Sequence, residues 1–137
     1  LVVDVQHVGS TAILDIPAKP IIDIDVGIKS AKDFKKCTKI LRNLGYELRE
    51  NAHRKNVHIL FAKGPEAKRT HYIHIIKWNG KIWKHDLAFR DYLRNNKEEA
   101  MVYARLKVVS AREFANDRRE YSKSKTSFIK SIISKAK

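Results

Sequence analysis

The chain has 137 residues, of which 43% are hydrophobic and 32% are charged, as in an ordinary soluble globular protein. These proportions exclude collagen-like and fully disordered chains, and no apolar run approaches the ~18 residues that a membrane span needs. The length corresponds to roughly one domain, so we expect a single domain over residues 1–137. One cysteine, Cys37, excludes an intramolecular disulfide and indicates a reducing, cytoplasmic setting.

The charge is strongly positive and unevenly distributed. The formal net charge is +14, and residues 1–50 hold eight basic and seven acidic residues, so nearly all of the excess follows residue 50. Such an excess attracts polyanions, among them nucleotide phosphates and RNA. Solvated, lysine-rich helix faces explain the same charge without any ligand.

The hydrophobic periodicity predicts five strands followed by helices. Strands are predicted over residues 2–8, 21–26, 46–50, 57–63 and 70–78. A helix is predicted between an N-cap at Ser30 and a stop at Gly45, with Cys37 on its apolar stripe. Three more helices are predicted near residues 82–95, 97–114 and 117–135. This order predicts an α+β fold in which helices back a mixed or mostly antiparallel sheet, with a C-terminal helical cluster.

Two aspartates interrupt an otherwise apolar strand. Asp23 and Asp25 are spaced by two, which places both carboxylates on one face of the strand and the neighbouring isoleucines and valine on the other. Aspartate is depleted in strands, and a divalent cation would relieve the repulsion between two adjacent carboxylates. We therefore predict that Asp23 and Asp25 bind Mg²⁺ or Mn²⁺; a solvated strand face bearing two acids is the alternative.

A Gly-Ser turn ends the first predicted strand. Gly9 lets the backbone approach a ligand closely, and Ser10 and the following N–H groups are suited to phosphate oxygens. Alone, such a turn is most simply a turn. Together with the Asp-x-Asp strand it supplies the parts that metal-assisted phosphoryl or nucleotidyl transfer requires.

The residues that carry these parts resemble a known family. The segment HVGSTAILDIPAKPIIDIDVGI (His7–Ile28) resembles the signature of the GrpB family, whose members have a nucleotidyltransferase-like fold. Arg69–Ile76, Phe89–Asn96 and Asp117–Ile129 resemble its remaining blocks. The resemblance implies a nucleotidyltransferase-type mixed sheet and an additional N-terminal segment that is missing here.

In the wider nucleotidyltransferase superfamily a third carboxylate lies on a later strand. The matching strand here, over residues 70–78, contains no Asp or Glu but offers His71 and His74. Because they are three residues apart, a regular strand points them to opposite faces. We select His74 as the residue that faces the site, where an imidazole would accept a proton or bind Mn²⁺ or Zn²⁺. A structural strand histidine is the alternative.

Two basic residues are candidates for phosphate binding. Lys125 falls on the stripe formed by Tyr121, Phe128 and Ile132, so it either extends to solvent or reaches the cleft. Arg69 precedes the histidine strand and would reach a triphosphate; a solvated turn arginine is the alternative.

The expected function is metal-dependent transfer of a nucleotidyl group from a nucleoside triphosphate to an unknown hydroxyl acceptor. Asp23, Asp25 and His74 are the candidate catalytic residues. Gly9, Ser10, Arg69 and Lys125 are the candidate phosphate ligands. The competing hypothesis is a catalytically inactive nucleotide- or RNA-binding module, in which the missing third acid has removed the chemistry. Neither hypothesis involves a membrane.

Overall fold

A computed structural model describes residues 1–13, 16, 20–49, 58–113 and 117–136 and shows one five-stranded sheet. Its strands are β1 (Asp4–Val8), β2 (Ile22–Ile28), β3 (Glu47–Arg49), β4 (His58–Lys63) and β5 (His71–Lys77). They lie in the order β1-β2-β5-β4-β3. The β2–β5 pair is parallel, whereas the other three pairs are antiparallel. The predicted α+β fold with a mixed sheet is confirmed.

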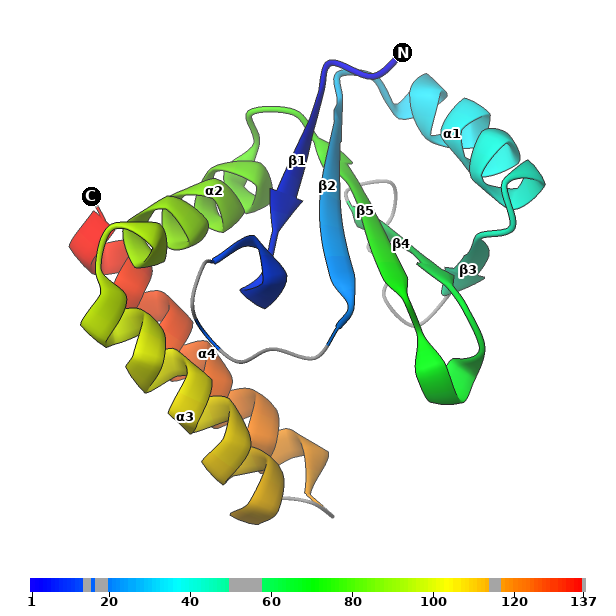
Figure 1. The fold of residues 1–137 in the computed structure, drawn as a ribbon. Coiled ribbons are helices and arrows are strands. Elements are labelled where there is room, and N and C mark those ends of the chain that lie inside the picture. Colours follow the sequence, from blue (N-terminus) through cyan, green and yellow to red (C-terminus); the bar gives the residue numbers. More distant parts are fainter. Residues whose placement is uncertain (14–15, 17–19, 50–57, 114–116, 137) are drawn as a thin grey trace.

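In the described part of the chain, four α-helices cover the two faces of the sheet. They are α1 (Ala31–Asn43), α2 (Lys81–Arg94), α3 (Lys97–Glu113) and α4 (Arg118–Ala136). Figure 1 shows α1 on one side of the sheet and the other three helices clustered on the opposite side. Short 3₁₀ turns, η1 (Ser10–Ala12) and η3 (Glu66–Lys68), follow β1 and β4.

The element boundaries follow the predicted capping chemistry closely. The Ser30 side chain accepts a hydrogen bond from the Lys32 backbone N–H at 3.3 Å, as expected of an N-cap. Gly45 follows α1 with φ of +88°, the left-handed conformation that favours glycine after a helix. The first strand begins at Asp4, two residues later than predicted. The predicted ends of the third and fourth strands, at residues 50 and 57, fall outside the described residues.

Among the described residues, two hydrophobic clusters hold the layers together. The first lies between α1 and the sheet and consists of Ile28, Phe34, Cys37, Ile59, Phe61, Ile73 and Ile75. The second joins the C-terminal helices to the loop after β1 and consists of Ile13, Phe89, Leu93, Ala100, Tyr103 and Ile132. Cys37 is therefore a core residue, as predicted. No helix in the described part of the chain combines the length and apolar character needed to cross a membrane.

The first cluster determines which way the acidic strand faces. Ile24 and Val26 of β2 pack against it, on the α1 side of the sheet. Because side chains alternate along a strand, Asp23 and Asp25 face the C-terminal helices. The shared face predicted for these aspartates is present.

Candidate functional site

A cleft of about 920 Å³ lies between the sheet and the C-terminal helices. It is large enough for a nucleotide-sized ligand. Its sheet side includes Gly9, Ser10, Asp23, Tyr72 and His74, so the strands and the turn singled out by the sequence meet in one place.

The Gly9 turn lies directly against the first aspartate. Val8 pairs with Asp23 across β1 and β2, which places the following glycine beside the carboxylate. Gly9 has φ of +75°, and a Cβ at this position would lie 2.7 Å from the Asp23 Oδ2 atom. Only glycine fits here without strain and overlap. The predicted contact between the turn and the aspartate strand is confirmed.

Asp25 is completely buried and, unlike Asp23, is not among the residues that line the cleft. Neither of its carboxyl oxygens has a hydrogen-bond partner among the described residues. Burial, then the adjacent Asp86 carboxyl and then the charge of Asp23 raise the pKa of Asp25 to about 9, although the Arg90 guanidinium opposes the shift. An acid at this position is costly unless a cation or a proton neutralises it.

His74 lies on the cleft side of β5 and contacts the first aspartate. Its Nε2 atom is 3.2 Å from the Asp23 Oδ1 atom, and its Nδ1 atom is 2.9 Å from the Nε2 atom of His58 on β4. His71 points away, with its ring 6.5 Å from that of Tyr46 and its Nδ1 within 2.9 Å of the Thr70 hydroxyl. The prediction that only one of the two β5 histidines reaches the cleft is confirmed, and that histidine is His74.

Basic side chains from α3 and α4 line the helical side of the cleft. Lys107 donates a hydrogen bond to the Ser10 hydroxyl and lies 4.8 Å above the Tyr103 ring. Arg112 and Lys125 also line the cleft. Lys125 therefore reaches the site, as one of its two sequence interpretations required, although the side chain of Tyr121 lies outside those described.

Arg69 does not join this site. Its guanidinium donates to the Gly64 carbonyl at 2.7 Å and to the Glu47 carboxylate at 3.0 Å, and its side chain is only 5% exposed. It connects the β4–β5 turn to β3 and is absent from the cleft lining. Arg69 therefore stabilises the edge of the sheet, where β3 pairs with β4.

Sequence reasoning missed Asp86, Lys107 and His58. Asp86 lines the cleft and is the third carboxylate near the β2 pair, but it comes from α2 instead of a strand. A signal for it exists: Asp86 lies three residues after Trp83 and three before Phe89, within the buried stripe of α2. A charge on such a stripe faces either a partner or a ligand.

The described residues contain no group of three or more His, Cys, Asp or Glu side chains arranged to hold one metal ion. Asp23 and Asp25 would therefore supply only part of the ligand set of a bound cation. This suits Mg²⁺, which binds through one or two carboxylates and takes its remaining ligands from water and substrate phosphates.

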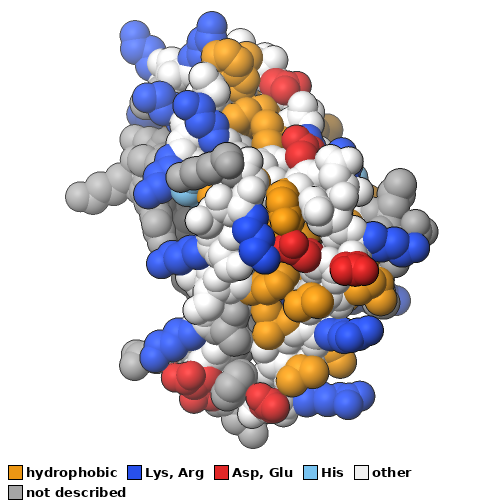
Figure 2. Space-filling model, turned by 90° about the vertical axis from the view of Figure 1, so that its left-hand side faces the viewer, with side chains coloured by type: hydrophobic (Ala, Val, Ile, Leu, Met, Phe, Trp, Pro, Cys, Tyr) orange, Lys and Arg blue, Asp and Glu red, His pale blue; other side chains and the backbone are white. Residues whose placement is uncertain are grey.

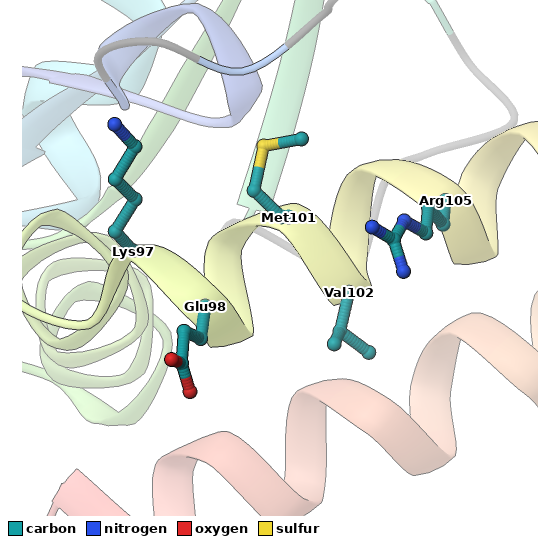
Figure 3. Close-up of a pocket in the computed structure, with 5 residues that line it drawn as sticks. All are labelled: Lys97, Glu98, Met101, Val102 and Arg105. Atoms are coloured by element: carbon teal, nitrogen blue, oxygen red, sulfur yellow. The ribbon is translucent and has the colours of Figure 1, made fainter.

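A second hollow, of about 620 Å³, lies on α3. Figure 3 shows its five lining side chains, Lys97, Glu98, Met101, Val102 and Arg105, all carried by this one helix. It shares no residue with the cleft and contains no paired carboxylates or glycine turn. We assign it no chemistry.

Comparisons with known proteins place the chain. The family model described as GrpB protein matches residues 1–135. The chain belongs to the GrpB family. It is 37% identical over 133 residues to the "Glutamate-rich protein GrpB" of Alkalihalophilus pseudofirmus, covering 95% of this chain and 76% of that protein. It is 34% identical over 136 residues to a "UPF0157 protein" of Pseudomonas aeruginosa, covering 96% of this chain and 54% of that protein.

A solved GrpB structure shares the fold. The crystal structure of "conserved protein GrpB from Enterococcus faecalis" matches with a TM-score of 0.82 and 32% identity. The match covers 98% of this chain and 80% of that one. The family resemblance seen in the sequence is thereby confirmed, and so is the α+β fold with a mixed sheet. These GrpB relatives carry names that state no reaction.

Proposed function

We propose that this GrpB protein binds a nucleoside triphosphate with a divalent cation, Mg²⁺ or Mn²⁺, and transfers its nucleotidyl group to a hydroxyl acceptor. The observation that carries the proposal is the contact of the Gly9-Ser10 turn with Asp23, in a cleft that also has basic residues on its helical side. Carboxylates for a cation and lysines for phosphates are the two halves of a triphosphate site.

The β2 residues fit a divalent cation. Both oxygens of the buried Asp25 lack partners among the described residues, and Asp23 presents its Oδ2 atom to the Gly9 turn. Oxygen donors of this kind suit Mg²⁺ and Mn²⁺. A cation held there would supply neutralisation of negative charge on the phosphate oxygens.

The remaining lining residues suit the phosphates and the nucleoside of a bound nucleotide. Lys107, Arg112 and Lys125 provide ammonium and guanidinium groups that bind and orient phosphate oxygens. Ser10 places a hydroxyl next to the Lys107 ammonium. Tyr72 and Phe89 form part of the apolar wall, which suits the nucleoside.

His74 would act through the carboxylate that it contacts. A carboxylate only accepts hydrogen bonds, so the 3.2 Å contact requires a proton on the His74 Nε2 atom. In this geometry His74 orients Asp23, and a role as general base would require its ring to leave that contact. The sequence-based choice of His74 as a catalytic residue stays a prediction.

A catalytically inactive nucleotide-binding module is the second candidate. It is favoured by the absence, within the described residues, of three or more side chains around one metal position. RNA binding has less support on the helical side of the molecule. Figure 2 shows the described Lys and Arg side chains of this side scattered around a central band of hydrophobic and acidic ones.

Calorimetric titration tests the proposal. A non-hydrolysable ATP analogue should bind the wild-type protein in the presence of Mn²⁺ and bind at least 10-fold more weakly in its absence. Asp23→Asn should remove the Mn²⁺-dependent part. Asp33→Asn, on α1 at the opposite face of the sheet, is the matched control and should bind like wild type.

Pyrophosphate release in the presence of ATP and candidate hydroxyl acceptors then separates enzyme from binding module. Release that Asp23→Asn abolishes supports nucleotidyl transfer. Mn²⁺-dependent binding with no release from any acceptor favours the inactive module, and no binding at all contradicts both.

A further inference from the structure

His58 extends the site onto a third strand. Its Nε2 atom lies 2.9 Å from the His74 Nδ1 atom, and the two rings are 5.1 Å apart with a tilt of 39°. His74 in turn contacts Asp23 through Nε2. Three side chains on the neighbouring strands β4, β5 and β2 thus form one continuous chain of hydrogen bonds.

The sheet register explains this chain. His74 pairs with Asp25 on the parallel strand β2 and with Leu60 on β4. Asp23 and His58 are each two residues from those partners, so they are diagonal neighbours on the same face. Long side chains reach such neighbours without distorting the strands.

The protons in this chain can be assigned from the bonding partners. Asp23 accepts only, so the His74 Nε2 atom carries a proton. When the His74 ring is neutral, its Nδ1 atom has no proton and must accept one hydrogen bond. The available donor at 2.9 Å is the His58 Nε2–H group.

We propose that His58 is a positioning residue that holds the His74 ring so that His74 fixes the rotamer of Asp23. The consequence concerns the two oxygens of that carboxylate. Oδ1 is occupied by His74, whereas Oδ2 is directed to the Gly9 turn, where a cation and phosphate would bind. The inference rests on the proposed function, because its benefit is a correctly oriented cation ligand.

Residues that orient a metal ligand have a measurable effect on metal affinity. Residues that orient metal ligands typically change metal affinity 10–100-fold when they are replaced. The side chains of His74 and Asp23 are 23% and 31% exposed. Both are therefore free to rotate once the hydrogen bond from His58 is lost. We expect removal of the His58 donor to weaken Mn²⁺ binding about 10-fold.

Three histidine variants test the proposal in the full chain. His58→Phe keeps a ring against His74 but removes the donor, whereas His58→Gln keeps an N–H donor. His71→Phe is the matched control, because this histidine of β5 contacts Tyr46 on the opposite side of the sheet. Circular dichroism and thermal melting identify any variant that fails to fold.

Two measurements are made on each variant with Mn²⁺ alone as the probe. Titration monitored by electron paramagnetic resonance gives the Mn²⁺ affinity. Nitrogen-15 NMR of the imidazole rings at pH 8 follows the His74 Nε2–H proton, which the bond to Asp23 should protect from exchange with water.

The expected result is a 10-fold loss of Mn²⁺ affinity and loss of the protected His74 signal in His58→Phe, with both restored in His58→Gln. His71→Phe should match wild type. Retention of the protected signal in His58→Phe overturns the inference, and so does an unchanged Mn²⁺ affinity. If the wild-type protein does not bind Mn²⁺, the proposed function fails, and the NMR signal alone decides whether His58 positions His74.

Discussion

Replacing Asp25 with asparagine should remove a stability penalty that grows with pH. Asparagine preserves the shape of the side chain but carries no charge. The pKa of Asp25 is raised from 3.8 to about 9, mainly by burial and by the neighbouring Asp86 carboxyl. Between these values the folded protein retains a proton that the unfolded chain has released, so stability falls as the pH rises.

The size of this effect follows from the width of the pH window. Each pH unit inside the window costs about 1.4 kcal/mol of unfolding free energy, since the unfolded chain alone loses its proton. From pH 5 to pH 8 the Asp25 contribution therefore falls by about 4 kcal/mol. This is a large fraction of the roughly 5–15 kcal/mol that stabilises a domain.

Urea unfolding with a chelator present measures the effect. We expect the free energy of unfolding of Asp25→Asn, relative to wild type, to rise by about 4 kcal/mol between pH 5 and pH 8. Ile24→Val is the control, because it lies on the same strand, faces the opposite core and has no ionisable group. An equal pH slope in wild type and Asp25→Asn would refute the claim that burial keeps this carboxyl protonated in the folded protein.

Three further substitutions separate the roles of the site residues. Gly9→Ala should cost about 2 kcal/mol more than Gly45→Ala, since both have positive φ but only the former meets a carboxylate; chemical denaturation measures the difference. Lys107→Met should weaken binding of the ATP analogue about 10-fold, whereas Lys97→Met on the outer hollow of the same helix should leave it unchanged. Arg69→Met should lower stability by about 1–3 kcal/mol, because the Gly64 backbone carbonyl loses its donor, and should preserve nucleotide affinity. Equal losses of nucleotide affinity in Gly9→Ala, Lys107→Met and Arg69→Met would contradict these assignments.

Local patterns predicted the elements of this fold well. The alternation in β2 and the cap residues around α1 are properties of a few adjacent residues, and the structure confirms both. The Gly9-Ser10 turn and Asp23 were assigned to one site because a phosphate-binding turn and paired carboxylates suit the same chemistry, and the sheet register places them in contact.

Contacts between distant elements were not predictable in the same way. The sequence showed Asp86 on a helix stripe, but nothing local indicated that α2 would deliver it to the β2 carboxylates. Lys107 likewise reaches Ser10 only because α3 folds back over the turn after β1. Arg69 was correctly predicted to precede β5. Its ion pair with Glu47 was not predictable, because it depends on where the edge strand β3 lies.

The most direct test of the account is a crystal structure of the protein with Mn²⁺ and a non-hydrolysable nucleoside triphosphate. Data collected at the manganese absorption edge locate the cation independently of the nucleotide. We expect an anomalous peak beside the Asp23 and Asp25 carboxylates, with the phosphate tail between the Gly9 turn and Lys107. A nucleotide bound elsewhere, or bound in this cleft with no cation at the two aspartates, would contradict it.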